Sequence, residues 1–305
     1  MKQFGHFVAI LFMVYLLSSC QKVDLTATYI SIDTTSFVMD VSHFNQDHAT
    51  GYDAGELASI SNQHFHDAWV VVNGTSLGTW ELPCKIPVLG SDSVRVSIYP
   101  GVKMNGVSTM RPRYPFVDPY TTTINLKGGT EIEIGTIPLQ YSAVTKFEFI
   151  ENFNRDYNGI FHASKDNGVN FLHGTAPDNP TNRIGIIDLT DSIQDFEIES
   201  SNMTFGHKVP NYVFLEMDYM CDYEDGAEVA VTMLIDKSTT SLTTSEPLVI
   251  ANASKKWKKI YVNLTQSVSR NQTNAIAYRV QLSGGRPDEN IPIHFYFDNI
   301  KVIYL

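Results

Sequence analysis

Two closely spaced pairs of carboxylates are the residues of this sequence that come nearest to an acid–base pair. Glu197 and Glu199 fall on one face of an expected strand, and Glu224 and Asp225 are adjacent. A glycosidase holds two carboxyl groups about 5–9 Å apart across a sugar cleft, and neighbouring strand positions can reach that separation. The sequence contains no Gly-x-Ser-x-Gly elbow, phosphate-binding glycine loop or His-Glu-x-x-His motif. We therefore interpret the carboxylates as a solvated strand face and expect no enzyme, with a hydrolase as the remaining catalytic alternative.

A His-Phe-His sequence is the second candidate for chemistry. His64 and His66 would place two imidazoles on one face of a strand. Together with Asp67, or with His43 and Asp47 before them, they could bind a transition metal. The polar, glycine-containing composition of residues 42–67 favours the simpler interpretation, a surface loop.

Aromatic side chains in expected loops are the candidates for sugar binding, because ring faces stack on the C–H surfaces of pyranoses. Trp257 is the single tryptophan of residues 143–305, and its place in an alternating strand favours packing over ligand contact. The candidates for glycan contact are therefore loop residues, namely Tyr157, Phe161, Tyr212 and Tyr223.

A proline-rich loop is the candidate for protein binding. Its relevant side chains are of the types enriched in protein interfaces, and its prolines reduce the ordering cost of binding. The alternative is that the loop folds over the end of its own domain. The side chains concerned are Arg111, Arg113, Tyr114, Phe116 and Tyr120.

The elements that must position these residues are strands. Most apolar segments are short and alternate with a two-residue period, which is typical of strands with one buried face. Asn73-Gly74 predicts a type I′ hairpin turn between two strands, and residues 126–130 predict a second hairpin. Residues 265–271 predict one short helical turn. The fold class is therefore all-β.

Composition limits the classes of partner. The chain has 305 residues and a formal net charge of −11. This acidic balance argues against nucleic acid, which requires a basic surface. Cys84 and Cys221 show no metal-binding spacing, and we expect them to be two separate thiols.

The N-terminus predicts the cellular location of the protein. One lysine, an apolar stretch and a small-residue boundary over residues 1–19 are typical of a secretory signal peptide. The sequence Leu-Ser-Ser-Cys that ends at Cys20 resembles the bacterial lipobox, in which the cysteine is acylated. The resemblance implies cleavage before Cys20, a tether over residues 20–25, and a membrane as partner through the lipid. We expect an outer-membrane, lipid-anchored protein that faces either the cell surface or the periplasm.

Two further resemblances divide the mature chain. Residues 146–153 (KFEFIENF), 257–264 (WKKIYVNL) and 295–302 (FYFDNIKV) resemble the galactose-binding-like jelly rolls that include many carbohydrate-binding modules. That resemblance covers residues 143–305. Residues 69–83 and 99–106 carry a weaker resemblance of residues 26–142 to a small, immunoglobulin-like β-sandwich of Bacteroidota outer-membrane lipoproteins. The expected architecture is thus two β-sandwich domains.

The jelly-roll resemblance also implies a possible structural calcium ion. In such modules calcium lies between acidic residues of the opening and closing strands, which here correspond to Glu148 or Glu151 and to Asp298. We expect no required cofactor, and calcium is the one candidate for a structural ion.

Two functions remain after these observations. The first is a non-catalytic subunit of an outer-membrane complex for secretion, barrel assembly or nutrient import, with a β-barrel or another envelope protein as partner. The alternative is a surface glycan-binding lipoprotein that uses the C-terminal jelly roll, which is an inference from fold resemblance.

Overall fold

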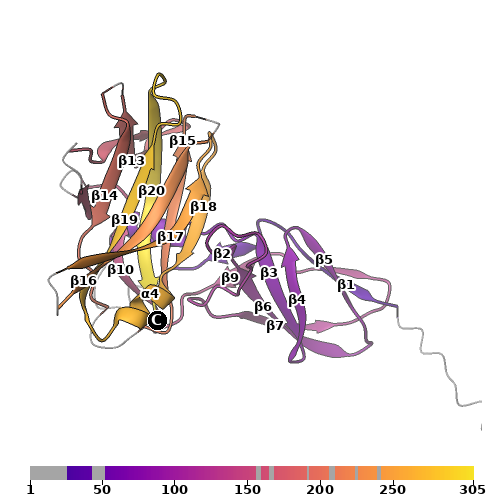
Figure 1. The fold of residues 1–305 in the computed structure, drawn as a ribbon. Coiled ribbons are helices and arrows are strands. Elements are labelled where there is room, and N and C mark those ends of the chain that lie inside the picture. The colour runs from indigo at the N-terminus through magenta and orange to yellow at the C-terminus, as the bar shows by residue number, and fades with distance from the viewer. Residues whose placement is uncertain are drawn as a thin grey trace, which may run out of the picture.

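The computed structural model describes residues 26–42, 52–155, 159–164, 168–190, 192–205, 210–223, 226–238 and 242–305. The expected lipidation site Cys20 and the candidates His43, Asp47 and Tyr157 lie outside these residues. The described chain forms twenty strands and two short helices, which confirms the all-β prediction. Figure 1 shows two β-bodies side by side, one built from β1–β9 and the other from β10–β20.

The N-terminal sandwich is built from three small sheets. The largest has the order β4-β3-β6-β7 and faces the sheets β5-β1-β8 and β2-β9 across a shared apolar core. Its strands are β1 (Thr28–Ile32), β2 (Phe37–Met39), β3 (Asp67–Val72), β4 (Thr75–Glu81), β5 (Cys84–Val88), β6 (Ser93–Gly101), β7 (Tyr120–Asn125), β8 (Glu131–Glu133) and β9 (Ile137–Leu139).

Of the two hairpin turns predicted in this sandwich, the first is present and the second is not. Asn73 and Gly74 have φ values of 47° and 83°, and β3 pairs with β4 across them, so the predicted hairpin is confirmed. The hairpin predicted at residues 126–130 was wrong, because β8 leaves β7 and pairs in parallel with β1. A Cβ atom at Gly128 would lie 2.8 Å from the carbonyl oxygen of Thr26, so this crossing requires glycine.

The C-terminal sandwich consists of two larger sheets with a jelly-roll-like alternation of strands. One has the order β12-β13-β20-β15-β18, with β10 also paired to β20, and the other has the order β11-β14-β19-β16-β17. The elements are β10 (Lys146–Glu151), β11 (Phe161–Ala163), β12 (Leu172–Ala176), β13 (Asn179–Leu189), β14 (Asp195–Ser200), β15 (Val213–Cys221), β16 (Glu228–Lys237), β17 (Thr243–Asn252), β18 (Lys258–Asn263), α4 (Thr265–Asn271), β19 (Ala275–Gly285) and β20 (Ile293–Tyr304).

Strand β15 shows how the two sandwiches meet. All nine of its residues are buried, although a surface strand would expose every second one. Leu215 and Met217 point into the C-terminal core, whereas Phe214 belongs to the apolar cluster of the N-terminal sandwich. Tyr261 of β18 and Ile303 of β20 join that same cluster. The outer face of this sheet is therefore partly covered by the N-terminal sandwich.

A helix that the sequence interpretation missed lies on the N-terminal side of this contact, where the Ser59 carbonyl accepts a hydrogen bond from Lys301. Residues 42–67 were expected to form a loop, but α3 (Ala54–Ser61) lies within them. Asp53 accepts a hydrogen bond from the backbone N–H of Glu56, and the Glu56 carboxylate accepts one from the backbone N–H of Asp53. This capping box begins the helix, and the signature Asp-x-x-Glu was available in the sequence.

Among the described residues there is no helix that is long and apolar enough to cross a membrane.

Candidate functional site

A cleft of about 970 Å³ lies where the two sandwiches meet, and we call it the inter-sandwich cleft. Its N-terminal wall comes from residues 62–67 and 101–106, and its C-terminal wall comes from the outer face of β13, β15, β18 and β20 with the end of β17. Six asparagines line it, namely Asn62, Asn105, Asn179, Asn182, Asn252 and Asn299. Four aspartates also line it, namely Asp67, Asp178, Asp218 and Asp298.

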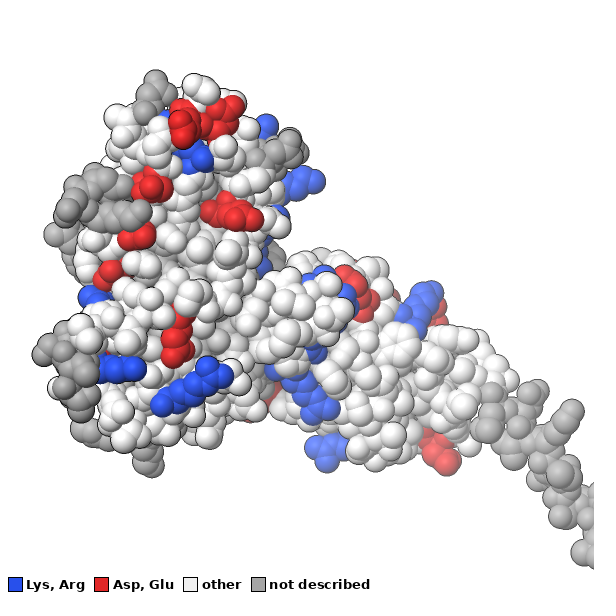
Figure 2. Space-filling model, viewed as in Figure 1, with Lys and Arg blue, Asp and Glu red and all other residues white. Residues whose placement is uncertain are grey.

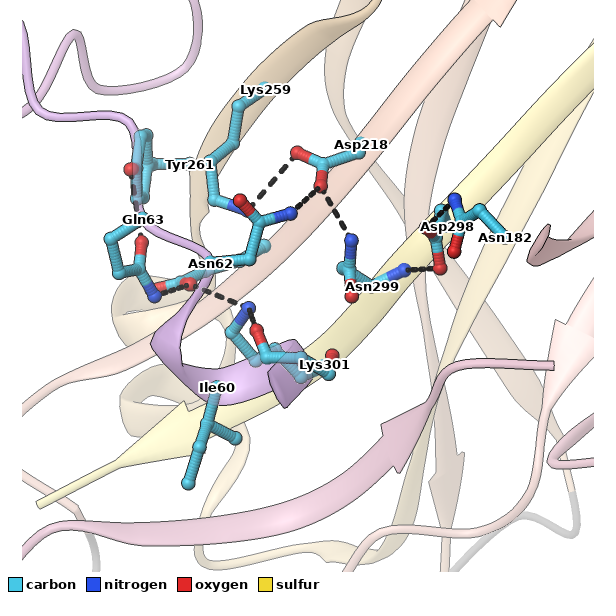
Figure 3. A network of polar contacts seen from close by, with 12 residues as sticks. Ile60, Asn62, Gln63, Asn182, Asp218, Lys259, Tyr261, Asp298, Asn299 and Lys301 are labelled. Atoms are coloured by element: carbon cyan, nitrogen blue, oxygen red, sulfur yellow. Dashed lines mark hydrogen bonds and ion pairs between the residues drawn. The ribbon is translucent and has the colours of Figure 1, made fainter. Parts of the chain in front are cut away.

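Asp218 is the centre of the hydrogen bonds at the cleft floor. Its Oδ1 lies 3.0 Å from Lys259 Nζ, and its Oδ2 accepts hydrogen bonds from the side-chain amides of Asn62 at 3.0 Å and Asn299 at 2.8 Å. Figure 3 shows these groups converging from α3's C-terminal side, β15, β18 and β20. Both wall segments therefore meet at one carboxylate, which fixes their side chains before any ligand arrives.

Asp298 is a second carboxylate on the same floor, and its acidity is altered. Its Oδ2 accepts a hydrogen bond from Asn182 Nδ2 at 2.9 Å, and its Oδ1 accepts one from the backbone N–H of Asn299 at 2.7 Å. Burial raises the pKa of Asp298 to about 6, these two hydrogen bonds partly oppose the rise, and the neighbouring Asp218 charge adds to it. The carboxyl group therefore titrates close to neutral pH.

Backbone geometry at the cleft also depends on asparagine. Asn299 and Asn105 adopt φ values of 51° and 55°, a left-handed conformation that asparagine tolerates better than most residues. Asn105 donates its backbone N–H to the carbonyl of Tyr261 at 2.8 Å, and its side-chain oxygen accepts the N–H of Asn263. These contacts join the 101–106 segment to the edge strand β18.

Trp257 stands at the rim of the cleft, just before β18. Its indole N–H donates to Asp178 Oδ1 at 3.2 Å, and its side chain is half-exposed. Beside it, Lys258 donates to the backbone carbonyl of Asn252 at 2.8 Å. Trp257 was expected to pack rather than to contact a ligand; it lies beside the edge strand β18, where its ring lines the cleft.

The two histidines of the His-Phe-His sequence also reach the cleft. His64 and His66 line it, while Phe65 between them is buried in the N-terminal core. Burial lowers the pKa of His64, so the imidazole is neutral at pH 7. No group of three His, Cys, Asp or Glu side chains suited to a metal ion occurs in the described part of the chain.

A buried polar network lies directly beneath the cleft floor. Gln63 donates to Glu216 at 2.9 Å and to the Tyr141 hydroxyl at 3.0 Å, and it accepts from the Tyr261 hydroxyl at 3.0 Å. Lys301 forms an ion pair with Glu216 at 3.3 Å. Since Gln63 neighbours Asn62 and Lys301 lies two residues from Asn299, this network holds the cleft floor in place (Figure 3).

The three carboxylates expected to hold calcium have other partners in the structure. Glu151 accepts the backbone N–H groups of Phe153 and Ile160, each at 2.9 Å. Glu148 accepts the N–H of Thr204 at 2.9 Å, and Asp298 is a cleft residue. Calcium binding at these residues stays a prediction.

The loop aromatics chosen as glycan contacts do not gather at the cleft. Phe161 is only 8% exposed and packs in the C-terminal core, where Tyr223 also packs. Tyr212 is exposed but precedes β15 by one residue, so it lies about 20 Å along the strand from Asp218. The cleft was missed because its residues come from seven separate segments of the chain.

The proline-rich loop packs in the core of its own N-terminal sandwich, at the side that meets the C-terminal sandwich. Tyr114 and Phe116 are at most 1% exposed, and the Tyr114 hydroxyl donates to Glu216. Arg111 forms ion pairs with Asp67 at 2.7 Å and Glu81 at 2.9 Å. The two buried rings are therefore unavailable to an outside partner, and the alternative that the loop folds over the end of its own domain describes them better.

The outer members of that loop have different surroundings. Tyr120 is half-buried on β7, where it packs against the N-terminal core. Arg113 is exposed and stacks on aromatic rings of the N-terminal sheet.

The free thiols Cys84 and Cys221 lie in different sandwiches, which confirms the expectation of two separate cysteines. Burial raises the pKa of both to about 11, so neither is a reactive thiolate at pH 7.

The lining of the cleft determines which ligands it can accept. Amide groups both donate and accept hydrogen bonds, and carboxylates accept them, which suits a ligand rich in hydroxyl groups. The cleft has four aspartates against three lysines, Lys103, Lys258 and Lys259, so it is no phosphate-binding basic groove. Figure 2 likewise shows charged side chains spread singly or in small groups over the described residues of this face.

Comparisons with known proteins give distant structural similarities. No family model and no curated protein matches the chain. Among solved structures, it is similar to a Clostridium thermocellum xylanase 10B fragment with CBM22-1 and GH10 modules, with 10% identity over 52% of this chain and 28% of that one and a TM-score of 0.40. It is also similar to a CBM22-1–CBM22-2 tandem domain from Paenibacillus barcinonensis Xyn10C, with 12% identity, 80% and 75% coverage and a TM-score of 0.39.

A third solved structure is of the same kind. It belongs to the promiscuous carbohydrate-binding modules of the β-sandwich superfamily, with 14% identity over 79% of this chain and 86% of that one and a TM-score of 0.38. All three similarities have low sequence identity and low TM-scores, so no ligand or activity of this chain follows from them.

Proposed function

We propose that this chain is a non-catalytic glycan-binding protein of the cell envelope, anchored by lipid on Cys20, which takes its ligand in the inter-sandwich cleft. One observation carries the proposal: six asparagines and four aspartates line a cleft with a half-exposed tryptophan at its rim. Planar amides and carboxylates match the paired hydroxyls of a sugar, and the indole face offers a surface on which a pyranose can stack. The outer-membrane location is part of this proposal.

The expectation of an outer-membrane complex has less support on the described surface. Large exposed apolar side chains occur on many separate elements, for example Leu172 on β12, Ile250 on β17 and Ile276 on β19. A stable protein interface needs a contiguous patch larger than this scattering provides. Assembly with a β-barrel or another envelope protein stays a prediction.

A glycoside hydrolase is the second candidate, and Asp298 is the observation that favours it. A glycosidase needs one carboxyl group with a raised pKa near a second, ionised one, and Asp298 and Asp218 share the cleft floor. However, Lys259, Asn62 and Asn299 occupy both oxygens of Asp218, and the oxygens of Asp298 accept two further hydrogen bonds. Groups engaged in this way suit binding better than proton transfer.

The test is a polysaccharide and glycan-array binding experiment on the full chain, with Trp257→Ala and Asn182→Ala as cleft variants. Loss of about 1–3 kcal/mol of binding energy is expected for the tryptophan variant, from lost stacking and burial. Tyr212→Ala is the matched control, because it removes an exposed aromatic ring outside the cleft. Binding that survives both cleft variants, or no binding to any glycan, would overturn the proposal. Reducing sugar released by the wild type but not by Asp298→Asn would favour the hydrolase.

A further inference from the structure

Arg113 forms a preorganised cation on the N-terminal sandwich, next to the inter-sandwich cleft. Its guanidinium carbon lies 4.1 Å from the centroid of the Tyr99 ring and 5.2 Å from that of Trp69. The two rings are cross-strand partners on β6 and β3, so they form one aromatic platform. Stacking of this kind holds a guanidinium flat and leaves its N–H edge free for solvent or a ligand.

The platform itself is held by its surroundings. The Trp69 indole N–H donates to the backbone carbonyl of Arg111 at 2.7 Å, which fixes both the ring and the loop that carries Arg113. Arg111 in turn donates from Nη1 to Asp67 at 2.7 Å and from Nε to the Ser108 carbonyl at 2.8 Å. The rings on which Arg113 stacks and the loop that carries it are therefore held by contacts of neighbouring residues.

The charges of the two neighbouring arginines are used differently. Arg111 is neutralised by Asp67 and by Glu81, and Lys103 also pairs with Glu81 at 3.1 Å. Arg113, which is exposed, has no carboxylate within ion-pair distance in the part of the chain that the structure describes. A cation that is fixed, exposed and unpaired in a protein of net charge −11 is suited to bind a carboxylate from outside.

The platform continues one wall of the cleft. Asp67 and Gly101 are cross-strand partners that line the cleft, and Trp69 and Tyr99 form the next pair on the same face of the same two strands. A Cβ atom at Gly101 would lie 3.3 Å from Trp69 Cδ1, so the cleft lining and the platform are in contact. An extended ligand that leaves the cleft along β3 and β6 therefore reaches Arg113.

We propose that the glycan bound in the cleft is a carboxylate-bearing polysaccharide, and that Arg113 binds a uronate carboxylate just outside the cleft. This inference rests on the proposed function of the cleft. It names the substrate class, an acidic glycan rather than a neutral one, and a residue that determines that specificity. A polysaccharide is favoured over an acidic protein because the platform is continuous with a cleft lined by amides.

The test compares uronate polymers with their carboxyl-reduced forms, which keep the linkages but replace each carboxylate with a hydroxymethyl group. Polygalacturonate, alginate and hyaluronan are run against the full chain in affinity electrophoresis. For at least one polymer we expect the native form to bind about tenfold or more tightly than its reduced form, as a charge-assisted hydrogen-bonded pair provides. In Arg113→Gln this difference should disappear, while binding of the reduced polymer stays as in the wild type.

Matched variants separate a specific contact from bulk charge. Arg95→Gln removes an exposed arginine from the same face of β6 without an aromatic platform, and it should keep the preference for the native polymer. Tyr99→Leu keeps the charge of Arg113 but removes part of its support, and it should weaken the preference without abolishing it.

Three results would overturn the inference. Equal binding of native and reduced polymers, with both lost in Trp257→Ala, would leave the proposed cleft function standing and remove the uronate. A preference for native polymer that Arg113→Gln keeps would place the carboxylate elsewhere. Binding of polyglutamate that depends on Arg113, without binding of any polysaccharide, would identify an acidic protein as the partner and also contradict the proposed glycan function.

Discussion

The Lys301 ammonium lies 3.3 Å from the Glu216 carboxylate, and both side chains are completely buried between the two sandwiches. Transfer of two ions out of water costs several kcal/mol for each, and the remaining polar partners must offset this cost. Tyr114 and Gln63 donate to Glu216, while Lys301 also donates to the carbonyl of Ser59 at 3.2 Å. All three of these partners come from the N-terminal half of the chain, so the ion pair is satisfied only when the sandwiches are docked.

Removal of one member of this pair should be strongly destabilising. Lys301→Met leaves the Glu216 carboxylate buried without its counter-ion, and we expect a loss of about 3–5 kcal/mol in the free energy of unfolding. Urea denaturation followed by tryptophan fluorescence measures it. In the double variant Lys301→Met/Glu216→Leu, part of this loss should be recovered, because neither member of the pair remains as an unpaired buried charge, although Tyr114 and Gln63 lose their acceptor.

The control for this prediction is a surface ion pair with a shorter N···O distance than the buried pair. Lys85 and Glu131 lie 2.7 Å apart with side chains 64% and 45% exposed, so Lys85→Met should change stability by less than about 1 kcal/mol. A double variant at Lys301 and Glu216 whose loss equals the sum of the two single losses would contradict the coupling.

The Tyr114 hydroxyl provides a second, smaller test of the interface. Tyr114→Phe keeps the ring in its aromatic cluster with Phe65 and Phe116 but removes a donor to the buried Glu216 carboxylate. A hydrogen bond to a charged group contributes about 1.5–3 kcal/mol, and thermal or urea unfolding should show a loss of that size. Tyr219→Phe is the matched control, since its hydroxyl contacts a carbonyl at the longer distance of 3.4 Å.

Sequence patterns predicted the strands well, because each strand's exposure is set locally by a two-residue period. The hairpin turn predicted at Asn73-Gly74 joins β3 and β4, and the helical turn predicted at residues 265–271 appears as α4. Helix α3 was missed because its single cue, the capping box at Asp53, lies in a polar stretch without helical periodicity. Local sequence patterns were therefore sufficient to predict the elements whose structure is determined by local interactions.

The candidate site was much less predictable. Asp218 and Asn62 are 156 residues apart in the sequence, and only the docking of one sandwich on the other brings them into contact. One signal was present, however: Glu216, Asp218 and Lys301 interrupt otherwise apolar strands. Charges in such strands indicate a second buried face, and hence a partner body on the outside of the sheet.

Glu151 should stabilise the segment that follows β10. Its two oxygens accept the N–H groups of Phe153 and Ile160 at 2.9 Å, and Glu151→Gln replaces one acceptor with a donor that faces an N–H group. We expect a loss of about 1–3 kcal/mol and faster hydrogen exchange at Ile160. Glu133→Gln on exposed β8 is the control. A calcium-dependent rise in melting temperature in the wild type, absent from Glu151→Gln, would support the predicted calcium site.

Asp298 should make stability depend on pH in an unusual direction. Burial raises its pKa in the folded state from 3.8 to about 6, so the folded state holds the proton more tightly than the unfolded state does. Its contribution to stability is therefore fully present below pH 4, falls as the pH rises to about 6, and is constant above that. Most carboxylates in ion pairs show the opposite trend.

The measurement is the free energy of unfolding of the wild type and Asp298→Asn at pH 5 and pH 7. Asparagine keeps an acceptor for the Asn299 N–H but cannot ionise, so the variant should gain about 1 kcal/mol relative to the wild type between these two pH values. Asp178→Asn, at the exposed rim of the same cleft, should show no such gain. A constant difference between wild type and Asp298→Asn would mean that Asp298 ionises in the folded protein as it does in water. Ligand binding through that carboxylate would then be insensitive to pH in this range.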